Sequence, residues 1–346
     1  METPLGTELV QPPQAASAAP ALPALRPLST GEVIDRALQL FRANFSRLFI
    51  VMLTFQAPIY VLAKVALLRT ASFVRQTAKG AQASDLVQLA WLMLLIAAIG
   101  FVSLLLYQLS LAAITAGSAR AYLGERIEAG LALREGFERA PQLVGTYLVL
   151  LAWCTLLLVL STVPGVGAMA LSFAVAAGPG RVALFVAGVV LALLLELVVL
   201  LYLLLRYAVV SEVVVIEKRS FIGSMRRSAA LMAGRIGPSL IDNCKIRLSI
   251  LYAVNFCISI SVMAVTSLPT ALLNSAYGVS PIDPERFDPS LVPLYLSVPV
   301  DVLGILTQAA VTPFGLLAVT VFYFDLRIRK EGFDLELLAS RMGTGK

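Results

Sequence analysis

Six long apolar blocks, separated by short charged segments, limit what this chain can fold into. The blocks lie near residues 48–68, 86–111, 143–163, 182–205, 248–268 and 294–324. Each is about twenty residues or longer, the length that an α-helix needs to cross a bilayer. The chain has 346 residues, of which 59% are hydrophobic and only 14% are charged. Soluble domains are about 45–50% apolar and about 25% charged. The sequence therefore predicts an all-α, polytopic membrane protein with six transmembrane helices.

The basic residues are distributed unevenly between these blocks. Twenty-one Lys and Arg fall in the two terminal segments and in the connections from block two to three and from block four to five, against 5 in the other three loops. Lys and Arg accumulate on the cytoplasmic side of membrane proteins. We therefore expect both termini in the cytoplasm, with the chain in a bacterial inner membrane. The net charge of +6 then reflects topology rather than nucleic-acid binding.

Three regions follow from this pattern. Residues 1–27 are rich in Pro and Ala without periodicity, which is typical of a disordered tail and here predicts a cytoplasmic one. Residues 28–325 form the predicted six-span membrane domain. Residues 326–346 form a charged cytoplasmic tail. Ser29 and Glu32 have capping-box spacing, so a helix is expected to begin there.

Charged amphipathic stretches precede the first, third and fifth apolar blocks. They are centred near Asp35, Arg134 and Arg226, and their pattern predicts helices that lie in the membrane interface. Their regular spacing is compatible with three repeats of elbow helix, span and span. The alternative is that any connector beside lipid has this pattern.

The third of these stretches, residues 206–247, is the most basic. A helix over 221–236 is expected to lie along the cytoplasmic surface. Its candidates for contact with an anionic lipid or a partner protein are Arg219, Arg226, Arg227 and Arg235. Each basic residue near an anionic surface contributes about 1 kcal/mol. The charges serve either topology and anchoring or recognition of a specific headgroup.

Two further features concern the spans themselves. The third block is predicted to end at Pro164–Gly165, and the run Met169–Ala177 is too short to span, so it is either interfacial or re-entrant. The sixth block is expected to be broken at Pro313.

Three ionisable residues lie inside apolar blocks, where a charge costs about 2.5–3.5 kcal/mol on insertion scales. Lys64 and Asp301 are expected at similar depth and are predicted to form an ion pair. This pair either holds two helices together or couples to an ion or substrate.

Glu196 is the third ionisable residue, and Gln108 and Asn255 are expected at comparable depth. Either Glu196 is protonated and hydrogen-bonded to these amides, or it binds a proton or a substrate. Gln308 belongs to a polar stretch near Pro313, which either lines a cavity or packs against a neighbouring helix.

The sequence provides little for catalysis. The chain has no histidine, which removes the commonest general base and the commonest metal ligand. Its three cysteines, Cys154, Cys244 and Cys257, are far apart and form no CxxC motif. No GxSxG, Walker A, HExxH or GxGxxG motif is present. We expect no enzyme activity, no cofactor and no metal.

Three segments resemble a prokaryotic membrane-protein family labelled the glycerophosphoryl diester phosphodiesterase membrane domain. They are LSTGEVIDRALQLFRANFSRLF (28–49), EKRSFIGSMRRSAALMAGR (217–235) and TVFYFDLRIRKEGFDLELL (320–338). The resemblance covers most of residues 28–338. The family label implies an attached phosphodiesterase, but this chain contains no such domain and no histidine, so the activity is not carried over.

Together these features favour a non-enzymatic membrane scaffold or accessory subunit, which engages a partner protein or anionic lipid at its cytoplasmic face. The alternative is a secondary transporter or channel that uses Glu196, Lys64 and Asp301. A homo-oligomer is compatible with either function, and no nucleic-acid partner is expected.

Overall fold

A computed structural model describes residues 26–77, 83–175, 177–237, 242–280, 291–333 and 335. Within these ranges all the regular elements are helices, and six of them are long and apolar enough to cross a membrane. The predicted all-α, polytopic fold is confirmed. The tail predicted at 1–27 lies almost entirely outside the described residues, as does the end of the chain from residue 336.

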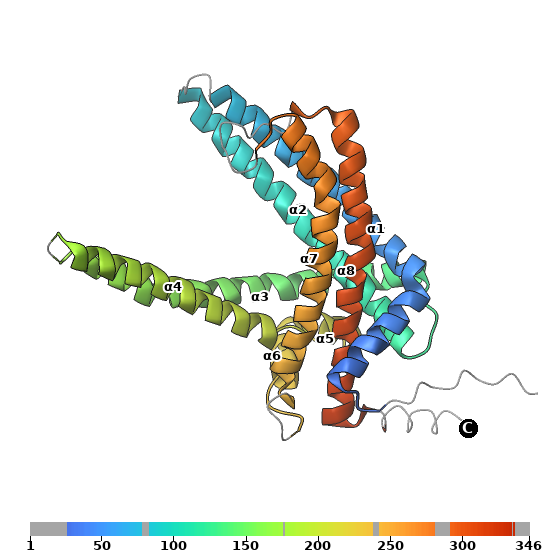
Figure 1. Cartoon of the computed structure of the whole chain (residues 1–346). Coiled ribbons are helices and arrows are strands. Elements are labelled where there is room, and N and C mark those ends of the chain that lie inside the picture. The colour runs from blue at the N-terminus through green and yellow to red at the C-terminus, as the bar shows by residue number, and fades with distance from the viewer. Residues whose placement is uncertain are drawn as a thin grey trace, which may run out of the picture.

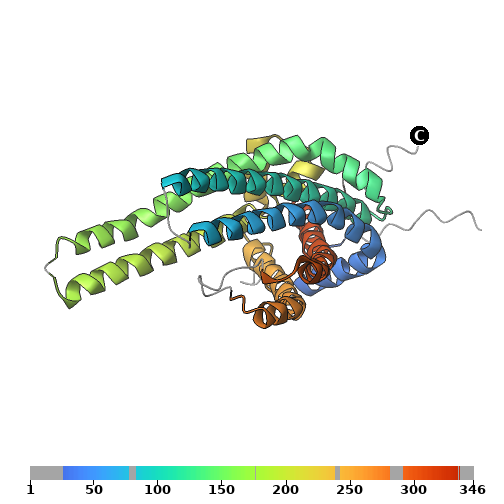
Figure 2. The ribbon, with the colours of Figure 1, turned by 90° about the horizontal axis from the view of Figure 1, so that it is seen from above.

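The six long helices form three hairpins (Figure 1). Their bounds are α1 Thr30–Thr77, α2 Ala83–Tyr122, α3 Ala129–Ser172, α4 Pro179–Arg206, α7 Cys244–Ala276 and α8 Leu294–Glu331. The pairs are α1 with α2, α3 with α4 and α7 with α8. Each hairpin begins and ends where the three converge, and at its far tip the first helix ends and the second begins. The α3–α4 hairpin projects away from the other two in Figure 1, and the view from above shows that it reaches farther than α1–α2 (Figure 2).

Two short helices lie where the hairpins meet. They are α5 (Val210–Ile216) and α6 (Phe221–Leu231). Six of the seven α5 residues are buried, so this apolar segment is part of the core rather than of a surface elbow. Helix α6 is shorter than the predicted helix at 221–236, because the chain turns at Gly234 with a φ of 82°. A left-handed φ is readily adopted by glycine and ends helices for that reason.

The protein core lies at this junction, which we call the hub. The hub comprises residues 28–55, 109–122, 209–231, 244–252 and 309–331, which include α5 and α6. Its largest fully buried side chains include Phe322, Tyr323 and Phe324, with Tyr122 stacked on Phe324 at a centroid distance of 4.6 Å. Large aromatic side chains contribute much of the apolar area that a core removes from water.

The outer parts of the hairpins are exposed. Trp91 is 67% exposed, Leu193 61% and Phe256 64%. Lipid chains are as apolar as these side chains, so helices in a bilayer need not bury them against one another. Most of the buried side chains therefore lie in the hub, and the exposed apolar side chains of the hairpins are suited to contact with lipid.

The amphipathic stretches near Asp35 and Arg134 are continuous with the spans that follow them, in α1 and α3. Figure 1 shows that α1 changes direction after its first third. The predicted capping box is confirmed at its start, where the Ser29 amide donates to Glu32 at 2.7 Å and the Glu32 amide to Ser29 at 3.3 Å.

The prolines do not interrupt the helices as expected. Helix α3 continues past Pro164–Gly165 to Ser172, and α8 continues through Pro313, so both predicted breaks are wrong. Met169–Ser172 form the last turn of α3 rather than a re-entrant segment. A helix satisfies its own backbone groups, and one proline removes only one donor, so in an apolar environment continuing the helix is favoured over breaking it.

Candidate functional site

In the hub, a buried charge network joins the segment just before α1 to the start of α7 and the end of α8. The Asp325 side chain is fully buried, and the Arg247 side chain is 4% exposed. Arg247 donates to Asp325 at 2.9 Å and to the backbone oxygen of Leu28 at 2.8 Å. The Leu28 amide and the Arg329 guanidinium also donate to Asp325, at 2.7 and 3.0 Å. The two ends of the membrane domain are therefore held together by one carboxylate.

A second network centres on Glu217, just before α6. It accepts hydrogen bonds from Arg227 at 3.0 Å and from the Tyr323 hydroxyl at 2.9 Å. Arg227 also donates to Glu331 at 2.6 Å. Burial by itself would lower the pKa of Arg227, but its hydrogen bonds to Glu331 and Glu217 outweigh this and raise it. The arginine therefore stays charged and ties α6 to α8.

These networks bring together the three segments that carry the family resemblance. Leu28 belongs to the first, Glu217 and Arg227 to the second, and Tyr323 and Asp325 to the third. Segments separated by more than 80 residues thus meet in the hub. Comparison of the chain with protein-family models, with curated proteins and with solved structures finds no match. The resemblance stays a prediction.

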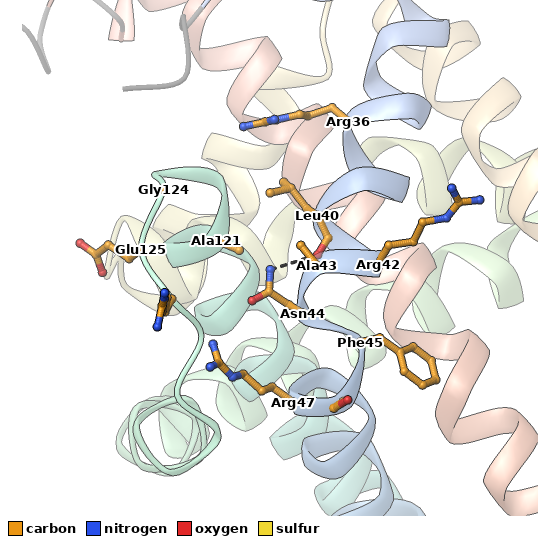
Figure 3. A pocket seen from close by; sticks show the side chains of 12 residues that line it. Arg36, Leu40, Arg42, Ala43, Asn44, Phe45, Arg47, Ala121, Gly124 and Glu125 are labelled. Carbon is orange, nitrogen blue, oxygen red and sulfur yellow. Dashed lines mark hydrogen bonds between the residues drawn. The ribbon is translucent and has the colours of Figure 1, made fainter. Parts of the chain in front are cut away.

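A basic pocket opens on the hub between α1 and the α2–α3 turn (Figure 3). Its volume is about 710 Å³, and we call it the arginine pocket. Arg36, Asn44 and Arg47 reach toward the turn at Gly124–Glu125, whereas Arg42 points to the other side of α1.

The arginine pocket carries more positive than negative charge. Four arginines line it, namely Arg36, Arg42, Arg47 and Arg126, against one carboxylate, Glu125. Among the described residues none of the four has an ion-pair partner. The sequence predicts basic segments before the first, third and fifth spans, but it does not predict that they form a pocket. The turn at Gly124 places Arg126 beside the arginines of α1.

The four arginines predicted to contact lipid or a partner are placed differently from one another. Arg227 is held by Glu217 and Glu331, and Arg219 donates to Glu217 at 2.8 Å. Arg226 and Arg235 are exposed and have no ion-pair partner within the described part of the chain. Arg226 and Arg235 are therefore the two with free guanidinium groups at the surface.

The predicted ion pair inside the spans is confirmed. The Lys64 ammonium lies 2.7 Å from Asp301, and the side chains are 19% and 23% exposed. The Tyr60 hydroxyl donates to the same carboxylate at 2.8 Å, and Lys64 also donates to Ser297 at 3.3 Å. The pair links α1 to α8 well away from the hub.

A cavity of about 460 Å³ extends from this ion pair between α7 and α8. Asp301, Gln308 and Thr312 line it, so the polar stretch of the sixth span lines a cavity, one of the two alternatives that the sequence left open. A smaller cavity of about 160 Å³ shares Asp301 and includes Lys64. The structure thus brings together three of the predicted intramembrane candidates, Lys64, Asp301 and Gln308.

The other three candidates are not brought together. Glu196 lies on α4, whose main neighbour is α3, and it has no hydrogen-bond partner among the described residues. Asn255 packs against Gly315 of α8. The side chain of Gln108 is buried, and its Oε1 atom has no partner. Of the two alternatives for Glu196, the one with hydrogen bonds to these amides is therefore wrong, and the other stays untested.

Besides Asp325, a second carboxylate is buried between the helices, that of Glu212 on α5. It is 1% exposed and accepts a hydrogen bond from Ser211 at 2.7 Å. Sequence reasoning missed it because the segment 206–247 reads as surface. The apolar run on both sides of Glu212 was the available signal. Within the described ranges no three potential metal ligands come together.

Proposed function

We propose that this chain is a non-enzymatic membrane scaffold or accessory subunit that holds an anionic ligand, a phospholipid headgroup, at its hub. Support comes first from the arginine pocket, in which Arg36, Arg47 and Arg126 have no ion-pair partner among the described residues. Phosphate oxygens accept hydrogen bonds from guanidinium groups in a planar, often bidentate geometry. The hub end of the hairpins would then face the cytoplasm of a bacterial inner membrane, because it carries most of the basic residues.

The rigid hub supports a scaffold role. Buried ion pairs at Asp325 and Glu217 hold α6, α7, α8 and the segment before α1 together, while the α3–α4 hairpin projects with exposed apolar side chains. A fixed base with a projecting hairpin is suited to holding a second membrane protein beside the first. Arg226 and Arg235 would extend the same basic face toward such a partner.

The alternative is a secondary transporter or channel, which would need a path from Lys64 and Asp301 to Glu196. The cavity at Asp301 has no residue of α4 in its lining. It therefore favours a local site rather than this path.

Lipid retention tests the proposal. The chain is purified in mild detergent from membranes that contain phosphatidylglycerol and cardiolipin, and bound lipid is measured by native mass spectrometry. Arg36→Gln/Arg47→Gln is expected to retain at least fivefold less anionic lipid than the unmodified chain. The control Arg69→Gln/Arg181→Gln removes the same charge near the hairpin tips and is expected to change retention less than twofold. Equal losses in both variants would show a general charge effect and overturn the proposal.

A further inference from the structure

Several hydroxyl groups that line the cavity beside Asp301 face it as hydrogen-bond acceptors. The hydroxyls of Thr266, Thr307 and Thr312 each donate their proton to a backbone oxygen of their own helix, at 3.0, 2.9 and 2.8 Å. A hydroxyl has one proton, so these groups present only lone pairs to the cavity. The Tyr60 proton is likewise used, on Asp301.

The Asp301 carboxylate has an unused oxygen. Both hydrogen bonds that it accepts from described residues, from Tyr60 and Lys64, reach Oδ2. An ionised carboxylate accepts at both oxygens, with about four lone-pair positions in all. Asp301 lines both neighbouring cavities, so its carboxylate adds a charged acceptor to the lining.

The size of the cavity indicates the kind of ligand. At about 30 Å³ per water molecule, 460 Å³ corresponds to about fifteen waters, far more than a bare metal ion requires. Apolar side chains, Val262, Met263, Ile305 and Val311, form part of the wall. Such a cavity suits a molecule with an apolar body and a cationic donor at one end.

We propose that the Asp301 cavity binds a small organic ammonium group, held by the Asp301 carboxylate and by those threonine oxygens of the lining that lie within its reach. The Lys64 ammonium already pairs with Oδ2, so it acts as a tethered competitor for the same carboxylate. The ligand is either a soluble amine or the headgroup of an amine-bearing lipid. This inference does not depend on the arginine pocket, which lies at the hub.

Calorimetric titration tests the site, with n-propylamine as the probe and n-propanol as its neutral counterpart. The chain is placed in phosphatidylglycerol nanodiscs, which contain no amine. Propylamine is expected to bind at least tenfold more tightly than propanol. Lys64→Met removes the competitor and is expected to tighten propylamine binding at least tenfold, whereas Asp301→Asn is expected to weaken it at least tenfold.

Milder variants keep the test informative if Asp301→Asn does not fold. Thr266→Val removes one acceptor and is expected to weaken binding severalfold. Thr162→Val makes the same change on α3, where the hydroxyl also bonds to its own helix, and is expected to have no effect. Propylamine binding no tighter than propanol in both the unmodified chain and Lys64→Met would overturn the proposal.

The two sources of the amine are separated by repeating the titration in phosphatidylethanolamine nanodiscs. If the lipid headgroup is the occupant, propylamine affinity falls at least fivefold in the unmodified chain. If a soluble amine is the occupant, the affinity is the same in both lipids. Either result is compatible with an ammonium site, provided that Thr266→Val weakens binding in phosphatidylglycerol.

Discussion

At the scale of single residues, the stability of the hub depends strongly on Asp325. Its carboxylate is fully buried and receives hydrogen bonds from Leu28, Arg247 and Arg329. Removing one partner of a buried ion pair leaves an uncompensated charge, which is far more destabilising than removing both. Thus Asp325 and Arg247 are required as a pair.

Asp325→Asn is expected to lower the free energy of unfolding by about 3–5 kcal/mol, because Arg247 stays buried without its counterion. Chemical denaturation in detergent micelles measures the change. Asp35→Asn alters an exposed carboxylate of α1 and is expected to change stability by less than about 0.5 kcal/mol. The double variant Arg247→Met/Asp325→Leu is expected to be more stable than Asp325→Asn. A double variant that loses the sum of both single effects would show that the pair does not interact.

Among the elements, the α3–α4 hairpin depends on small residues. A Cβ atom added at Gly165 would lie 2.5 Å from the Cβ of Ala192, and one added at Gly188 would lie 2.8 Å from the Gly165 backbone oxygen. The two backbones therefore approach closely at this point. Small residues at helix contacts permit such packing in membranes, where no hydrophobic force drives helices together.

Gly165→Leu is expected to force α3 and α4 apart, because the larger side chain has no space. Spin labels at Phe173→Cys and Phe185→Cys, in a chain whose native cysteines are replaced by Ala, report the separation by electron spin resonance. The expected result is a longer and broader distance distribution. Gly167→Leu is the matched control, since nothing lies within 4 Å of a Cβ added there. If both variants broaden the distribution equally, the close contact does not hold the hairpin.

At the scale of the whole molecule, all three hairpins start and end at the hub. Each hairpin has two helices that can cross a membrane, so both of its hub ends lie on the same side of that membrane. The basic segments lie at the hub, and the tips carry few basic residues. This arrangement agrees with the predicted topology, but the side that faces the cytoplasm stays a prediction.

Cysteine labelling tests that topology. In a chain whose native cysteines are replaced by Ala, Gly178→Cys at the α3–α4 tip is expected to react with a membrane-impermeant maleimide in spheroplasts. Arg226→Cys at the hub is expected to react only in inverted membrane vesicles. The reverse pattern would invert the orientation, and labelling of both sites from one side would contradict the six-span topology.

The candidate site could be predicted only in part. Lys64 and Asp301 are predictable as a pair because a charge inside an apolar block requires a partner, and depth can be counted along a helix. The expected hydrogen bonds of Glu196 were also inferred from depth alone, and they are absent among the described residues. Depth does not specify which helices are neighbours, and α4 packs mainly on α3 rather than beside Gln108 and Asn255.

The sequence by itself determined the class of fold and the places where helices cross an apolar layer, because length and hydropathy are local properties of the chain. Tertiary structure decided which segments, far apart in sequence, contact one another. It buried Glu212 and α5, joined Leu28 to Asp325 and placed Arg126 beside α1. Its physical basis is side-chain packing and charge pairing between segments far apart in sequence, which no local pattern encodes.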